Sequence, residues 1–574
     1  MSEVRERIRN WPSAVVVGVT AWAMTACVLL YRLPYGVSHR DEAFYSAMPY
    51  SFLLGNRPYT DELALHQNAA LLLVPFYRAY VAIVGSADGI ILFNRGLYFI
   101  YAAVCSIMAY RFVKRVATHG AACWAGALVL SFSYFNLFAL SYNTQGAFGV
   151  LCGSLCTANA LLGSRPGRLL FGASLFFLSA LFSYPGCAAA VVPYAAVVVW
   201  WLFRRVPRSA RSNGLIGLGA GVAVAFGTLV PLAIWIGAPG FQRLREFSQS
   251  MGYATKGVAA KLDFYHSSSW EWHRPLLGFV AIFALLPIVC LLLERLLWGV
   301  ALATLAACGF CYWHGLQSSA PLGVTVYLVA IPVLAPVCVA LNRGWQHGGL
   351  VLSLVWLPSV LSMAAVAYSS ANGYDAVSLG ALGALVAGVS SFWAYLATLS
   401  ARRPARRLGY RVVLGSFLAS CLVLQLHSLF EYVYDENDPT FQALNTRVRT
   451  GPLRGTITTP AGAELAEAVD HDLKSLEASA KSLTVFDGFA TGYLSTRLQP
   501  RTFSQWIVWV MNAKYDLKIM AETFGNGREL PDLVLKYRMK PVSQKLWAKY
   551  ERKHYHVAVE RKDLGYVIMQ RNAP

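Results

Sequence analysis

The chain has 574 residues, of which 56% are hydrophobic, and a formal net charge of +20. Its mean hydropathy is +0.46, and long apolar runs alternate with short basic clusters. This composition excludes a set of water-soluble domains and indicates a polytopic α-helical membrane protein. Most cations of the apolar part lie in short loops between the runs, where the positive-inside rule accounts for them, so the charge does not indicate nucleic-acid binding.

The basic clusters predict the topology, because short loops rich in Lys and Arg remain in the cytoplasm. Placing every cluster inside pairs the apolar runs and gives thirteen spans, with a cytoplasmic N-terminus and an outward tail. The predicted spans are 12–31, 90–113, 119–138, 145–163, 168–185, 187–203, 213–237, 275–294, 296–314, 321–341, 348–369, 376–399 and 410–430.

Residues 68–84 are apolar but short for a span, and they contain Pro75 and Arg78. Counting them as a span would place Lys114 outside and invert every later loop. We therefore predict an amphipathic helix on the outer membrane surface. The first outer loop then runs over 32–89.

Two adjacent acids, Asp41 and Glu42, follow the first span. Residues 1–430 hold only 12 of the 29 acids by our count, so this pair is unusual. Adjacent acids at the mouth of a span are costly unless they are solvated, paired or used. They either begin a hydrated loop or supply a catalytic carboxylate at the membrane surface.

The other outer loops add candidate ligand-binding residues. Lys and Arg residues in outer loops are exceptions to the positive-inside rule and indicate a site for an anionic ligand. Snorkelling interface residues explain some of them. The long loop 238–274 contributes Arg243, Arg245, Lys256, Lys261 and Arg274. Ligand contacts, or ordinary polar loop positions, are expected at Tyr59, Asp61, Glu62, His66, Asn143, Asn372 and Asp375.

The tail, residues 431–574, is charged and periodic and predicts a small α/β domain outside the membrane. Helices are expected over 461–480 and 543–553, strands over 482–486 and 531–535, and a closing hairpin over 554–570. The tail has no Gly-rich phosphate loop and no Cys/His ligand set, so we expect a lid or a recognition module.

A carboxylate at the outer surface with cations around it suits a lipid-linked phosphate donor. Arg and Lys hold the phosphate at the interface. The carboxylate accepts the proton of an attacking hydroxyl, which is the general-base arrangement of inverting glycosyl transfer.

The chain resembles the GT-C superfamily of polyprenyl-phosphate-sugar glycosyltransferases, and within it the protein O-mannosyltransferase and lipid A aminoarabinose transferase group. The likeness rests on Asp41-Glu42 with the following Ala-Phe-Tyr45, on Phe93-Asn-Arg95 at the second span, and on the layout. The first loop has Leu65-His66-Gln67-Asn68 where family members often carry Glu-Lys-Pro, and the Trp-Trp-Asp motif of oligosaccharyltransferases is absent.

The resemblance implies a bacterial inner-membrane enzyme in which residues 1–430 form the catalytic transmembrane domain. It makes Asp41 the base with Glu42 in support, and Arg40 a neighbour that keeps Asp41 ionised. Arg95 is either a donor-phosphate ligand or the structural partner of a first-loop acid. At least one of the outer cations meets the phosphate.

The expected reaction moves one sugar, a pentose such as arabinofuranose or a hexose, from a polyprenyl-phosphate donor. The acceptor is an extracytoplasmic glycan, lipid or protein. No metal ligands are assigned and no cofactor is specified, with a divalent metal left open. The alternative is a transporter or flippase of a lipid-linked sugar, which would show internal repeats and broken helices at the midplane.

Overall fold

The computed structural model describes the chain except for short segments and both ends. The described residues are 12–64, 67–163, 166–184, 186, 188–250, 257–267, 270–318, 322–370, 373–431, 433–434, 440–486, 488–502, 504–505, 530–538 and 541–572.

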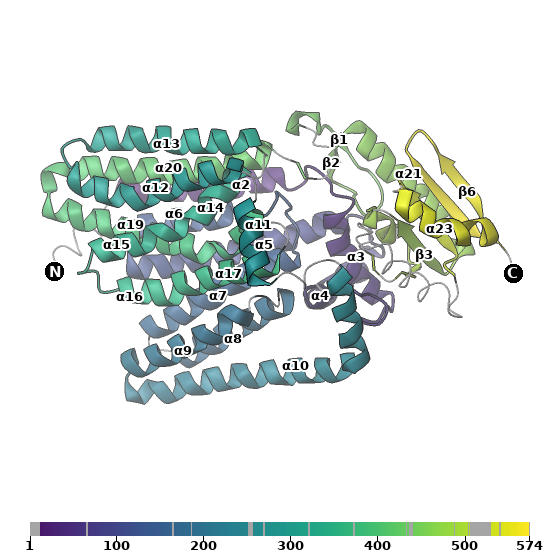
Figure 1. The fold of residues 1–574 in the computed structure, drawn as a ribbon, viewed down its shortest axis with the longest axis horizontal. Helices are drawn as coiled ribbons and strands as arrows, with labels where there is room; N and C mark the ends of the chain where they lie inside the picture. The colour runs from purple at the N-terminus through teal and green to yellow at the C-terminus, as the bar shows by residue number, and fades with distance from the viewer. Residues whose placement is uncertain are drawn as a thin grey trace.

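Long apolar helices lie along the longest axis of the molecule and form a bundle, and a sheet lies beyond one end of that bundle (Figure 1). Ten helices in the described part of the chain are long and apolar enough to cross a membrane, and three shorter apolar helices accompany them. The protein is a polytopic helical membrane protein, as the composition predicts.

All thirteen predicted spans coincide with helical segments. The helices are α2 (Pro12–Arg32), α5 (Ile90–Val116), α6 (His119–Leu130), α7 (Tyr142–Leu162), α8 (Pro166–Ser183), α9 (Ala188–Arg205), α10 (Arg208–Ser250), α12 (Trp270–Leu292), α13 (Leu297–Ser318), α14 and α15 (Leu322–Ala330, Leu334–Leu341), α16 and α17 (Gly348–Val351, Leu357–Ser369), α19 (Leu382–Arg402) and α20 (Arg407–Glu431).

One predicted span is shorter than expected, because α6 ends at Leu130 and not at residue 138. Residues 131–141 form an irregular turn in which Phe135 and Asn136 have φ of 53° and 54°. Ser and Asn side chains compete with the helix for backbone groups. Here the Ser131 hydroxyl donates to the Leu128 carbonyl at 3.2 Å, and Asn136 Nδ2 donates to the Ser428 carbonyl of α20 at 2.6 Å.

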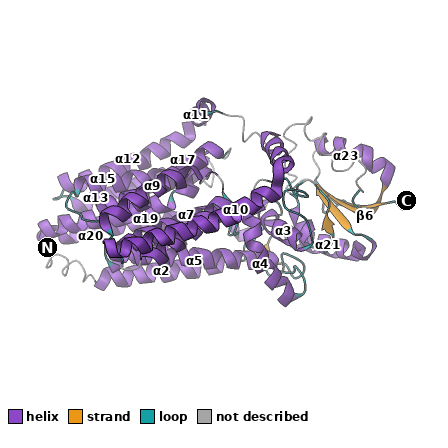
Figure 2. Ribbon diagram, turned by 90° about the horizontal axis from the view of Figure 1, so that it is seen from below, coloured by secondary structure: helices purple, strands orange, loops and turns teal. Residues whose placement is uncertain are grey.

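The segment predicted to lie on the membrane surface forms α4 (Gln67–Val84). By length and composition α4 is among the ten helices that could cross a membrane. It packs on the short helix α3 (Asp41–Leu53), at the end of the bundle nearest the sheet (Figures 1 and 2). Its depth in the membrane stays a prediction.

The tail contains a five-stranded sheet of order β4-β3-β5-β7-β6. Its strands are β3 (Ser482–Phe486), β4 (Gln499–Pro500), β5 (Leu533–Tyr537), β6 (Tyr555–Arg561) and β7 (Tyr566–Arg571), with helices α21 (Pro460–Leu476) and α23 (Pro541–His554). β3 is parallel to β4 and β5, and β7 is antiparallel to β5 and β6. These elements confirm the predicted helices, strands and closing hairpin, whereas the domain boundary at residue 430 stays a prediction.

The tail is attached to the first loop by backbone hydrogen bonds. β1 (Thr446–Arg447) pairs with β2 (Ile457–Thr458), and Ile457 of β2 also forms a bridge to Tyr35. The Ile457 amide donates to the Pro34 carbonyl at 2.7 Å, and the Gly36 amide donates to the Ile457 carbonyl at 2.9 Å. The loop that leads into α3 is therefore held between the bundle and the tail.

Candidate active site at the head of α3

Helix α3 begins with the two acids singled out from the sequence. The Asp41 amide donates to the Ser38 hydroxyl at 3.0 Å, which satisfies one of the unpaired donors of the first turn. Negative charge is favourable at a helix N-terminus because the macrodipole is positive there. Both acids are nevertheless buried, with Asp41 8% and Glu42 1% exposed, so each needs a partner.

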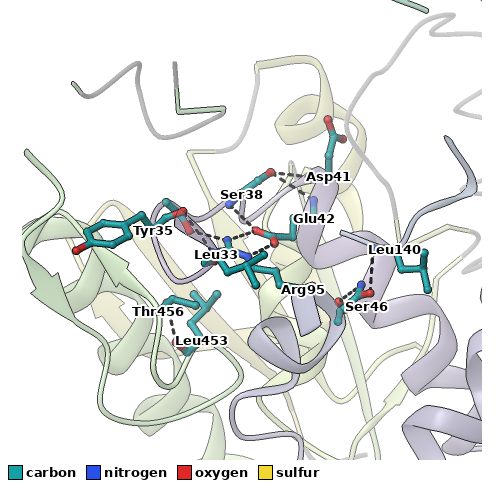
Figure 3. A network of polar contacts seen from close by, with 12 residues as sticks. Leu33, Tyr35, Ser38, Asp41, Glu42, Ser46, Arg95, Leu140, Leu453 and Thr456 are labelled. Atoms are coloured by element: carbon teal, nitrogen blue, oxygen red, sulfur yellow. Dashed lines mark hydrogen bonds and ion pairs between the residues drawn. The ribbon is translucent and has the colours of Figure 1, made fainter. Parts of the chain in front are cut away.

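Glu42 has its partner in Arg95 of α5 (Figure 3). Arg95 Nε donates to Oε1 at 2.5 Å and Nη2 donates to Oε2 at 2.7 Å. The same guanidinium also donates to the carbonyls of Leu33 at 2.5 Å and Gly36 at 2.6 Å. Arg95 thus ties the first loop to α5, which is the structural one of its two predicted roles.

Asp41 has different surroundings. Its carboxylate points away from the Glu42–Arg95 pair (Figure 3). The Tyr434 hydroxyl donates to Asp41 Oδ2, and Arg40 Nε lies 4.0 Å from Oδ1. The structure therefore separates the two adjacent acids into one that is locked in an ion pair and one that is held by a hydroxyl beside a cation.

The tail also holds the two residues that precede Asp41. The ring of His39 stacks on Phe489 at 4.5 Å, and His39 Nδ1 lies 3.0 Å from the Thr491 hydroxyl. Burial lowers the pKa of His39 to about 4, so this ring is neutral at pH 7. A Cβ on Gly488 would lie 3.4 Å from Cδ of Arg40, so this residue packs against the tail as well.

Tyrosines form a row on the bundle side of Asp41. Tyr45 of α3 meets Tyr142 edge-on with ring centroids 5.7 Å apart, and Tyr142 stacks on Tyr184 at 5.9 Å. Burial first, and then Tyr142 and Asp41, raise the pKa of Tyr45. Tyr45 is therefore a neutral hydroxyl near the carboxylate. Aromatic faces of this kind are suited to packing against an apolar sugar face or a prenyl chain.

Two of the first-loop candidates form the loop's own turn. The Arg57 amide donates to Asp61 Oδ2 at 2.9 Å, and Arg57 Nε does so at 3.3 Å. The Tyr59 amide donates to Gln67 Oε1 at 2.6 Å, and its hydroxyl donates to Asn68 Oδ1. These contacts favour the reading of Asp61 as a loop residue, while Tyr59 closes the turn onto α4.

Glu62 is fully buried between the loop and the tail. Its carboxylate accepts from the amides of Ala64 at 2.9 Å and Gln505 at 2.8 Å. Burial raises the pKa of Glu62 to about 6, against the opposing effect of these bonds. Glu62 therefore joins the tail to the first loop, a role that its place in the sequence did not indicate.

Among the predicted outer cations, Lys261 is the buried one of the three whose side chains are described. Its ammonium donates to the Ser370 carbonyl at 2.5 Å, from helix α11 (Val258–Ser267). Arg245 and Arg274 are exposed, on α10 and α12. The side chain of Arg243 and the whole of Lys256 lie outside the described residues.

The remaining candidates are dispersed. Asn143 is buried in the first turn of α7, next to Tyr142. Asp375 belongs to the short helix α18 (Gly373–Val377), and its side chain is not described. His66 and Asn372 lie outside the described residues. Over the described part of the chain, no three His, Cys, Asp or Glu side chains form a metal-binding group.

The residue that sequence reasoning missed is Tyr434. It is separated from Asp41 by 393 positions and follows the last apolar helix in a short stretch without a motif. Tyr45 and Tyr142 lie near the ends of apolar runs in the sequence, but only the fold brings Tyr45 close to Asp41 and packs Tyr142 against Tyr45.

No protein-family model and no curated protein sequence matches the chain. Solved structures do resemble it. Apo ArnT from Cupriavidus metallidurans has 13% identity and a TM-score of 0.46, and the match covers 98% of each chain. The same protein bound to undecaprenyl phosphate gives 13% identity, a TM-score of 0.46, and coverage of 98% of this chain and 99% of that one.

The archaeal oligosaccharyltransferase AglB from Archaeoglobus fulgidus, in complex with an inhibitory peptide and a dolichol-phosphate, has 11% identity and a TM-score of 0.47. That match covers 92% of this chain and 70% of AglB. ArnT and AglB belong to the GT-C superfamily, which the sequence resembles. At these identities and TM-scores the likeness carries no argument about the reaction, so the function is argued from the side chains.

Proposed function

We propose that this protein is an inverting glycosyltransferase of the bacterial cytoplasmic membrane. It moves one sugar from a polyprenyl-phosphate donor to a glycan, lipid or protein acceptor outside the cytoplasm. The N-terminus is cytoplasmic in this proposal, and the tail from residue 431 is outside. A pentose such as arabinofuranose and a hexose are both consistent with the site.

One observation carries the proposal, namely that the Asp41 and Glu42 carboxylates have different contacts. Glu42 is neutralised by Arg95, and the two side chains are bound to each other in a structural ion pair. Asp41 instead accepts a hydrogen bond from the Tyr434 hydroxyl, and Arg40 Nε lies 4.0 Å from its Oδ1. A buried carboxylate is costly for folding, and use as a catalytic base is a reason to keep one.

In the proposed reaction Asp41 accepts the proton of the acceptor hydroxyl as its oxygen bonds to the anomeric carbon. The bond from that carbon to the phosphate oxygen breaks, and polyprenyl phosphate leaves with the electron pair. Attack opposite the leaving group inverts the anomeric centre. Asp41 later releases its proton to water.

The donor phosphate requires a cation, and Lys261 is the candidate that we propose. Ser369 precedes the Ser370 carbonyl that Lys261 binds, and the Ser369 hydroxyl donates to the Tyr184 hydroxyl at 3.3 Å. Tyr184 belongs to the tyrosine row that leads to Asp41. A lysine ammonium at this place would supply the positive charge that a phosphate requires.

The test is transfer by the purified protein in detergent or nanodiscs. The donors are polyprenyl-phosphate pentose or hexose, and a soluble nucleotide sugar is supplied alone as the comparison. The proposal expects turnover with a lipid-linked donor and an inverted anomeric configuration in the product. Turnover of the nucleotide sugar without lipid, or retention of configuration, would contradict it.

A further inference from the structure

We infer that Tyr434 is a positioning residue, whose hydroxyl orients the Asp41 carboxylate for proton transfer. The inference rests on the proposed function, because it assigns a task to a neighbour of the proposed base. It concerns a residue from the junction between the last apolar helix and the tail, which no sequence motif marks.

The contact is direct, since the Tyr434 hydroxyl donates to Asp41 Oδ2. The ring of Tyr434 lies 5.6 Å from the ring of Phe135, which fixes the direction from which the hydroxyl approaches. The preceding residue, Val433, is buried against the first loop. A Cβ on Gly36 would lie only 2.6 Å from Cγ1 of Val433, so the Val433 side chain packs on the Gly36 backbone at a place where any larger residue would clash.

The turn beneath Tyr434 has a strained backbone. Phe135 and Asn136 both have positive φ, which is unfavourable for residues with a side chain. Asn136 Nδ2 donates to the Ser428 carbonyl at 2.6 Å, and the Ser133 hydroxyl donates to Asn136 Oδ1 at 2.8 Å. The C-terminal end of α20 therefore holds residues 133–136 in place. Phe135 from this segment then packs against the Tyr434 ring.

The other ionisable groups around the carboxylate come from several elements. Arg40 and Glu42 flank Asp41 in the chain, and Glu42 is neutralised by Arg95. Tyr45 of α3 lies close enough to interact electrostatically with Asp41, Tyr142, Tyr134 and Tyr434. The Tyr434 hydroxyl donates its hydrogen bond directly to the carboxylate.

The Tyr434 hydroxyl limits how the Asp41 carboxylate can turn. It fixes the plane of the carboxylate, so that Oδ1 is presented in a defined direction to the acceptor hydroxyl. Removing the hydroxyl should therefore disturb this orientation and lower kcat more than the binding of the donor.

The test compares Tyr434→Phe with Tyr410→Phe. Tyr410 is a matched control, because its hydroxyl also donates to a carboxylate, Glu294 Oε2 at 3.4 Å, near the opposite end of α20. We expect Tyr434→Phe to lower kcat by about ten-fold, the effect of losing a hydrogen bond to a charged group. KM for the lipid donor should change less than about two-fold, since no phosphate contact is lost. Tyr410→Phe should match the wild type in both kcat and KM.

Asp41→Asn is measured in parallel to separate two failures. Near-normal turnover of Asp41→Asn would refute Asp41 as the base, and the proposed function with it. If Asp41→Asn is inactive while Tyr434→Phe keeps the wild-type kcat, only the positioning role is refuted. A lower Tm together with a fall in rate that disappears when kcat is expressed per folded molecule would assign Tyr434 a purely structural role and also overturn the inference.

Discussion

The Glu42 carboxylate and the Arg95 guanidinium form a buried bidentate ion pair, with contacts of 2.5 and 2.7 Å, between residues 53 positions apart. The pair attaches the first loop to α5, because Arg95 also binds three carbonyls of that loop. Asp41 directly precedes Glu42 in the chain, so the position of Asp41 depends on this ion pair.

Breaking this ion pair should destabilise the protein strongly. Arg95→Met leaves a carboxylate buried without a cation, which typically costs about 3–5 kcal/mol. Asp61→Asn is the control, because it breaks the exposed pair with Arg57, worth about 0–1 kcal/mol. Thermal unfolding in detergent measures both variants. A similar fall in Tm for the two would contradict the structural role of Arg95.

Asp41→Asn tests the proposed base. It keeps the shape of the side chain but removes the proton acceptor, and we expect a loss in kcat of about 10²–10⁴-fold. Donor binding should change far less, because the proposal assigns the phosphate to a cation and not to this acid. Glu42→Gln should reduce kcat less per folded molecule, and mainly lower the amount of folded protein. Binding of the lipid donor is measured beside the transfer assay.

The raised pKa of Glu62 predicts that the stability of the protein depends on pH. Its pKa in the folded protein is about 6, above the ordinary 4.5, so the folded state binds the proton more tightly. Burial of the charged form therefore lowers stability above pH 6. This loss is relieved as the pH falls from about 6 toward 4.5, by about 2 kcal/mol in all.

The comparison for Glu62 is Glu62→Gln, which carries no charge at any pH. The Tm of the wild type relative to this variant should rise as the pH is lowered from 7.5 to 4.5, because the other titrating groups cancel. A constant difference across this range would show that Glu62 does not titrate in the folded state.

Gly36→Ala should impair both folding and activity. Gly36 has φ of +79°, and a Cβ there would lie 2.6 Å from Val433, next to Tyr434. Gly55→Ala is matched for backbone strain, since Gly55 has φ of +99°, but its Cβ would have nothing within 4 Å. In both variants, alanine in a left-handed backbone conformation destabilises the fold by about 1–2 kcal/mol. Only Gly36→Ala should lose transfer activity, and equal activity of the two would contradict the close approach.

The topology is tested by labelling single cysteines introduced into a background without the eleven native ones. We expect a cysteine at Lys114 to be protected from an impermeant reagent in intact cells, and one at Gln499 to react. Cysteines along α4 should be reachable only from outside. Reaction at position 114, or protection at position 499, would invert the membrane orientation and place the site in the cytoplasm.

The helices and their order could be predicted because hydrophobic length and basic loops are local properties of the chain. The strands 482–486 and the closing hairpin were predicted for the same reason, from alternation and turn residues. The end of α6 was not, since Ser131, Ser133 and Asn136 take their partners from their own turn and from α20. Among site residues, Asp41 and Glu42 were found because acids are rare in that half of the chain.

The membrane class, the helical segments and the loop in which the acids lie follow from the sequence alone, because each depends on the polarity of neighbouring residues. The surroundings of the two acids depend on the fold. Arg95 and Tyr434, 53 and 393 positions from their partners, divide the adjacent acids into a locked pair and a hydrogen-bonded carboxylate. Adjacent carboxylates are alike in sequence, and only the charges and donors that the fold brings to each make them chemically different.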